Sequence, residues 1–177
     1  MRIYVPATLD ELASAVVDAA GARWDVPARR VHAVTPALAR ELPDEDEEGR
    51  EYEAFLAAAD DSLALVAARR ADAPLRTVVS LDVPDDRVTP ADGADEPSAL
   101  EVAALPGAPV VAVHVDEPEA ADDVRAALAA ADAENDAERA GGAGAGSGAD
   151  LDDALQRVTD RDLLWYDPTE IPRIPRP

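Results

Sequence analysis

The scarcity of aromatic side chains most constrains what this chain can fold into. Its 177 residues include two Trp, three Tyr and one Phe, although apolar residues make up 47% of the sequence. Ala, Val and Leu must therefore fill most of the core, and the few large rings are expected to be buried first. A chain of this length can bury roughly 70% of the surface that it exposes when unfolded. We therefore expect one domain whose core consists mainly of small residues.

The charge of the chain disfavours two classes of partner. Sixteen basic and 38 acidic residues give a formal net charge of −22, which repels nucleic-acid phosphates and anionic lipids. The sequence has no cysteine, no signal-peptide pattern and no run of 18 apolar residues. We expect a cytoplasmic protein without a nucleic-acid or membrane partner, and adaptation to salt is the simplest interpretation of its acidity.

The first elements are read from local patterns. Residues 2–5 are rich in β-formers and predict a strand. Thr8 and Glu11 have the spacing of a capping box, and the apolar residues that follow predict a helix over residues 9–20. Gly21 is expected to end that helix.

The next segment predicts a strand and two helices. The strand covers residues 31–34, and Thr35 with Pro36 marks the start of the first helix. An acidic stretch follows, in which we expect Asp44 to cap the second helix. Residues 52–66 show apolar side chains at three- and four-residue spacing, so this helix is the clearest element. Its apolar stripe is Tyr52, Phe55, Leu56, Ala59, Leu63 and Val66.

The second half of the chain predicts more strands, a linker and a tail. The expected elements are strands at residues 76–83, 99–105, 110–115 and 163–166, with helices after Pro118 and over residues 150–158. We divide the chain into a main body at residues 1–139, a flexible Gly/Ala/Ser linker at 140–149, a C-terminal helix and strand at 150–171 that pack back on the body, and a Pro-rich tail at 172–177. This order predicts a mixed α/β (α+β) single domain with a mixed sheet of about five or six strands flanked by helices.

Two C-terminal features allow a partner-binding interpretation. Trp165 and Tyr166 would suit an interface, but in a chain with so few rings we expect them in the core. Residues 172–177 have the spacing of a polyproline ligand, but we expect a disordered end.

Two motif matches fail on their context. Asp44 to Gly49 resembles the first half of a calcium-binding loop, but Phe55 stands where a bidentate carboxylate is required. Residues 144–149 match a loose dinucleotide fingerprint, but they do not follow a predicted strand. The sequence therefore predicts no metal site and no cofactor.

One group of residues remains as a candidate catalytic site. His114 and Asp116 lie two residues apart on one predicted strand and share a face, and Asp82 lies at the end of another. If the two strands are neighbours, these side chains could converge and act as a general base or hold a divalent cation. The simpler interpretation is that His114 is half exposed and that Asp116 caps the following helix.

Several segments resemble a known family. These are residues 1–8, 33–38, 112–116 and 163–166 followed by Glu170 and Ile171. In this order they resemble an uncharacterised actinobacterial family of small proteins that is known only as a domain of unknown function. The resemblance implies an intracellular role and assigns no activity, cofactor or catalytic residue.

Two classes of function follow from these observations. The preferred hypothesis is a non-enzymatic binding or regulatory module with a protein or small-molecule partner. The alternative is a small hydrolase or metal-assisted enzyme that uses His114, Asp116 and Asp82.

Overall fold

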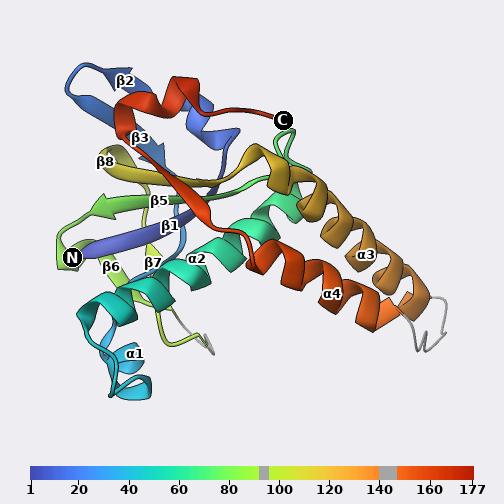
Figure 1. The fold of residues 1–177 in the computed structure, drawn as a ribbon. Helices are drawn as coiled ribbons and strands as arrows, with labels where there is room; N and C mark the ends of the chain where they lie inside the picture. The colour runs from blue at the N-terminus through green and yellow to red at the C-terminus, as the bar shows by residue number, and fades with distance from the viewer. Residues whose placement is uncertain (92–95, 140–146) are drawn as a thin grey trace.

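A computed structural model of the chain describes residues 1–91, 96–139 and 147–177 (Figure 1). The strands are β1 Arg2–Thr8, β2 Val16–Asp18, β3 Gly21–Val26, β4 Arg29–His32, β5 Arg76–Asp82, β6 Val88–Pro90, β7 Ala99–Val102, β8 Leu105–Asp116 and β9 Leu163–Tyr166. The α-helices are α1 Pro36–Glu41, α2 Glu47–Arg69, α3 Ala121–Arg139 and α4 Ser147–Thr159. Short 3-10 helices cover η1 Glu11–Ser14, η2 Asp85–Arg87, η3 Pro118–Ala120 and η4 Pro168–Arg173.

The described strands form one nine-stranded sheet in the order β2-β3-β8-β5-β1-β4-β7-β6, with β9 paired to β8. The predicted mixture of helices and strands is confirmed, but the expected sheet of five or six strands was too small. Every described strand pair is antiparallel, so the expectation of a mixed sheet was wrong. Long connections separate many of the strands that pair, and the order along the sequence does not reveal them.

The sheet curls into a roll. The roll stays open, because its edge strands β2 and β6 do not pair with each other. Three strands separate β3 from β4 in the sheet, yet only Pro27 and Ala28 join them along the chain. A flat sheet would place the two strands about 19 Å apart, at about 4.8 Å per strand, whereas this link spans at most about 11 Å. Consistent with this curvature, the Arg29 guanidinium on β4 lies 5.7 Å from the ring centroid of Trp24 on β3.

A short 3-10 helix and the first strand of a β-hairpin occupy the segment where we predicted a helix over residues 9–20. The Thr8 amide does donate to the Glu11 carboxylate at 3.0 Å, but the helix that follows is only η1, whose N-cap is Asp10 without a side-chain cap. Two β-branched residues then begin β2, and Gly21 opens β3 with φ of +140°. Pairing of β3 with β8 overrides the helical periodicity of this segment.

The two faces of the sheet bury separate apolar clusters. Inside the roll, strands from across the sheet contribute to one large apolar cluster that includes the fully buried Ile3, Val5 and Leu81. Helix α2 crosses the other face (Figure 1). There Ala58 and Ala59 pack against a second cluster that includes Tyr4 and Val78. The small residues of α2 let the helix lie close to the strands.

The helix starts are only partly as predicted. Thr35 caps α1, and its hydroxyl accepts hydrogen bonds from the amides of Ala37 and Leu38 at 3.1 Å. Helix α2 begins earlier than its apolar stripe, and its cap is Asp46, which accepts a bond from the Gly49 amide at 2.9 Å. The choice of Asp44 as the cap was therefore wrong.

Helices α3 and α4 pack together away from the sheet (Figure 1). Their small cluster joins Val124 of α3 and Val158 of α4 to Val66 of α2. The predicted linker at residues 140–149 lies largely outside the described residues, but Ser147–Thr159 is helical, so the linker prediction extended too far and α4 begins before Asp150.

The C-terminal segment is ordered, contrary to the expectation of a disordered tail at residues 172–177. Ile174 is 5% exposed and belongs to the main core. Arg176 donates to the Leu9 carbonyl at 3.0 Å and to the Asp10 carboxylate at 3.1 Å. In the part of the chain that the structure describes, no helix has the length and apolarity needed to cross a membrane.

Candidate functional site

Four of the six aromatic side chains and one histidine meet on the face of the sheet that α2 covers. A cavity of about 670 Å³ opens between α2, β1, β5, β8 and β9. We call it the aromatic pocket, because its walls include Tyr4, Tyr52, Phe55, His114 and Trp165. A volume in this range is typical of sites that take small organic molecules.

Antiparallel pairing places these residues side by side. His114 on β8 lies opposite Trp165 on β9 and opposite Val78 on β5, so the three side chains share one face. One step along the sheet, Ser80 on β5 lies opposite Tyr4 on β1. Strands from both ends of the chain therefore build the floor of the aromatic pocket.

Helix α2 supplies the opposite wall through Tyr52 and Phe55, which are three residues apart. The Phe55 ring meets the His114 ring edge to face, with centroids 4.9 Å apart, and meets Tyr4 in the same way at 6.0 Å. Tyr52 stacks on Phe55 at 6.3 Å. Phe55 is thus the central ring, while Tyr52 is 54% exposed at the rim.

A β-bulge shapes the floor next to His114. The register between β5 and β8 shifts between Ser80 and Leu81, so that Val111 has no direct partner on β5. Both Val111 and Ala112 line the aromatic pocket as a result. Bulges of this kind are common beside binding sites because they redirect side chains.

His114 is held neutral near pH 7 by its surroundings. Burial lowers its pKa, because an apolar environment penalises the imidazolium form. Its Nδ1 atom is buried and has no hydrogen-bond partner among the described residues. A histidine that acts as a general base is usually oriented by a partner at its second nitrogen, and such a partner is missing at Nδ1.

Tyr4 is also neutral. Burial, followed by the negative charge of Glu51, raises the pKa of Tyr4 to about 12. Its hydroxyl therefore keeps its proton throughout the physiological range.

Asp116 forms a buried, structural ion pair with Arg76. Its carboxylate accepts bonds from the Arg76 amide at 2.7 Å and from the Arg76 guanidinium at 2.8 Å. The side chains of Arg76 and Asp116 are 3% and 0% exposed. The simpler interpretation, in which Asp116 caps the following helix, was wrong. The carboxylate of Asp116 is instead buried against Arg76.

Asp82 lies at the far end of its strand from His114. Strands β5 and β8 are neighbours, as the hypothesis required, but they are antiparallel, so their carboxyl ends point in opposite directions. Asp82 follows Val78, the partner of His114, by four residues, which is about 13 Å along a strand. It accepts bonds from Arg2 at 2.8 and 3.0 Å. The structure does not bring His114, Asp116 and Asp82 together.

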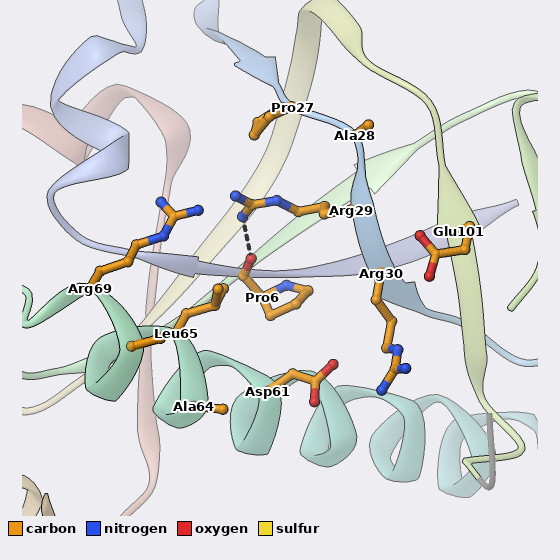
Figure 2. A pocket seen from close by; sticks show the side chains of 11 residues that line it. Pro6, Pro27, Ala28, Arg29, Arg30, Asp61, Ala64, Leu65, Arg69 and Glu101 are labelled. Atoms are coloured by element: carbon orange, nitrogen blue, oxygen red, sulfur yellow. Dashed lines mark hydrogen bonds between the residues drawn. The ribbon is translucent and has the colours of Figure 1, made fainter. Parts of the chain in front are cut away.

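A second pocket, of about 520 Å³, lies between β4 and the C-terminal half of α2 (Figure 2). In Figure 2, Arg29 and Arg69 extend into the same space, and a dashed line joins Arg29 to the Pro6 carbonyl, 2.6 Å away. Both guanidinium groups also bind Glu11, at 2.5 and 2.7 Å. Burial opposes ionisation of Glu11, but the hydrogen bonds from Arg29 and from the Thr8 amide hold its pKa below the usual value. These arginines tie η1 to β4 and α2, which is a structural role.

A buried Ser-His-Asp series lies nearby, and the sequence did not suggest it. His32 is 1% exposed; its Nδ1 contacts the Ser98 hydroxyl at 2.8 Å and its Nε2 contacts the Asp61 carboxylate at 3.1 Å. The hydrogen bond from His32 lowers the pKa of Asp61. Ser98 is fully buried, so no substrate can reach its hydroxyl, and the series joins α2 to the sheet. His32 is therefore a buried histidine that joins α2 to the sheet.

The aromatic residues of the pocket were the ones that sequence reasoning missed. Tyr52 and Phe55 were assigned to the core stripe of α2, and Trp165 was assigned to the core, yet Trp165 is 59% exposed. The spacing of Tyr52 and Phe55 on one helix was the available signal. Their meeting with Tyr4 and Trp165 depends on long-range pairing.

Comparison with known proteins gives one result. A family model described as a family of unknown function (DUF6912) matches residues 1–174. No curated protein and no solved structure matches the chain. Among the described residues, no group of three or more His, Asp and Glu side chains is placed to hold a metal ion.

Proposed function

The chain belongs to the DUF6912 family, whose function is unknown, and we propose from its aromatic pocket that it is a non-enzymatic module that binds a small organic molecule. The observation that carries this proposal is the gathering of Tyr4, Tyr52, Phe55 and Trp165 around one cavity. A chain with only six aromatic residues would bury them all if stability alone decided their places. Instead, Tyr52 and Trp165 remain more than half exposed at the rim.

The polar groups of the pocket support binding rather than catalysis. Arg76 is buried against Asp116, and Arg2 is paired with Asp82. His114 is neutral and its Nδ1 lacks an orienting partner among the described residues. The enzymatic alternative needed His114, Asp82 and Asp116 in one place, and its geometric basis is therefore absent.

Trp165 provides a direct test, because the only other tryptophan, Trp24, is 2% exposed inside the roll. A library of small organic molecules is screened for compounds that raise the melting temperature, since a ligand of the folded state stabilises it. Binding in the pocket should also change the fluorescence of Trp165. We expect the rise in melting temperature to be lost in Trp165→Ala, and both effects to be kept in Leu164→Ala, a neighbouring exposed residue that does not line the pocket. Hits that bind Trp165→Ala unchanged, or a screen without hits, would overturn the proposal.

A further inference from the structure

The charges around the aromatic pocket indicate which class of molecule it takes, provided that the proposed binding function holds. Three arginines line the pocket, namely Arg2, Arg76 and Arg161. Each of them is already neutralised by carboxylates that do not line it. Arg2 pairs with Asp82 at 2.8 Å, Arg76 with Asp116 at 2.8 Å, and Arg161 with Asp123 at 2.7 Å and with Glu117. The positive groups are thus committed to the protein itself.

The acidic groups of the lining are in the opposite situation. Glu48, Glu51 and Asp162 line the pocket, and none of them forms an ion pair with a described residue. Residues 92–95 and 140–146, which the structure does not describe, contain no basic side chain. Arg2 lies close enough to feel the charge of Glu51, but its guanidinium bonds go to Asp82. Three carboxylates without an ion pair to any described residue therefore line the same pocket as the aromatic rings.

The neutral polar groups leave this balance unchanged. Burial lowers the pKa of His114, so the imidazole carries no charge at pH 7. The hydroxyl of Tyr4, with a pKa of about 12, is also uncharged. The pocket consequently has a net negative potential, in a chain with a formal charge of −22 that already attracts cations from solution.

Aromatic faces next to carboxylates form an environment that suits an organic cation. The face of a Trp or Tyr ring attracts an ammonium group within about 6 Å of its centroid, and rings grouped around one cavity recognise quaternary amines. Tyr52 and Trp165 have exposed rings at the rim, and Glu51 lies one residue before Tyr52 on α2. An anionic ligand would find no free guanidinium here, and a neutral one would leave the three carboxylates unused.

We propose that the aromatic pocket binds an organic cation, a protonated or quaternary amine, between Tyr52, Phe55 and Trp165, with Glu48, Glu51 and Asp162 supplying the negative charge. The net attraction comes from ring faces and carboxylates together. The preference for a cation distinguishes the aromatic pocket from the second pocket beside β4, where Arg29 and Arg69 both pair with Glu11.

Three probes of nearly equal shape test the charge preference: choline, its neutral analogue 3,3-dimethyl-1-butanol, and the anion 3,3-dimethylbutanoate. Their affinities are measured by titration calorimetry and by Trp165 fluorescence on the full chain, at constant ionic strength because salt alone affects so acidic a protein. We expect choline to bind at least about tenfold more tightly than the alcohol, which corresponds to about 1.4 kcal/mol. The carboxylate should bind most weakly.

A matched pair of variants separates the pocket from the general charge of the protein. Glu51→Gln should reduce the preference for choline over the alcohol, whereas Glu53→Gln, on an exposed side chain outside the pocket, should leave it unchanged. Equal effects of the two variants would attribute the preference to net charge and overturn the proposal. It would also be overturned if the alcohol or the carboxylate bound as tightly as choline, or if none of the probes bound at millimolar concentration. The library screen with Trp165→Ala judges the binding function separately, so the failure of one is distinguishable from the failure of the other.

Discussion

His114 and Trp165 stand directly opposite each other, one on β8 and the other on β9, and both line the aromatic pocket. β9 follows the helical pair α3 and α4, so the chain leaves the sheet and returns before the pocket is complete. The candidate site therefore depends on the docking of the last strand, and measurements of its binding also report on that docking.

The stability of the protein should fall when the pH is lowered from 7 to about 5.5, partly because of His114. Its pKa in the folded state is lowered by burial, so the unfolded chain binds the proton more readily. The stabilisation from the neutral ring is fully present above the ordinary pKa of about 6.5 and is lost as the pH falls through that value toward the folded pKa. Urea denaturation of His114→Phe should show a smaller loss over this interval. An unchanged loss would mean that His114 is not titrating differently in the folded state.

Asp116 and Asp82 should differ sharply in their contribution to stability. Asp116→Asn leaves the buried guanidinium of Arg76 without its counter-charge, which typically costs about 3–5 kcal/mol. Asp82→Asn removes an ion pair whose side chains are 39% and 58% exposed, worth about 1 kcal/mol or less. Chemical denaturation of both variants measures the difference. Similar losses would contradict the assignment of Asp116 as a structural ion-pair partner.

Replacing a small residue of α2 by a larger one should destabilise the protein only where the helix contacts the sheet. Ala58 is fully buried against the strands, so Ala58→Leu should cost about 1–3 kcal/mol through overpacking. Ala64→Leu, at an exposed position of the same helix, should change the free energy of unfolding by less than about 0.5 kcal/mol. The two variants have the same change in composition and can be compared by urea denaturation, and equal losses would indicate that the face of α2 is misassigned.

The last residues should contribute to folding. Ile174→Ala should destabilise the protein by about 2 kcal/mol or more, because Ile174 is 5% exposed in the main core. Arg173→Ala, at the exposed position before it, provides the control. Fast exchange of the amide hydrogens of Ile171, Arg173 and Ile174 in the wild type, together with an unchanged stability of Ile174→Ala, would restore the expectation of a disordered tail.

Local patterns predicted many of the elements but not their arrangement. The strands predicted at residues 2–5, 31–34, 76–83, 110–115 and 163–166 all correspond to strands of the sheet, and the helical periodicity of residues 52–66 was confirmed. These signals arise from neighbouring residues. The hairpin of β2 and β3 was missed because β3 is held in the sheet by pairing with β8, about 80 to 90 residues away in the sequence.

The candidate site could be predicted only in part for the same reason. His114 was singled out from the sequence and does line the pocket, but the expected carboxylate partners were chosen on the assumption that neighbouring strands run in parallel. Trp165 was expected in the core, since no local signal distinguishes a buried ring from one at the rim of a cavity. The tail was expected to be disordered because the contact between Arg176 and Asp10 joins opposite ends of the chain.

The pairing of β3 with the distant β8 has a consequence for the order in which the chain acquires its structure during synthesis. β3 leaves the ribosome early, but its ladder partner, the first part of β8, follows only after residue 105. For part of this interval β1 also lacks its partner β5. Strands β1 and β3 therefore each have an unpaired edge that could associate with other nascent chains. Folding dominated by such distant pairings is intrinsically slow. The dense negative charge of the chain would then protect the growing polypeptide, because like-charged chains repel one another until the rolled sheet can close.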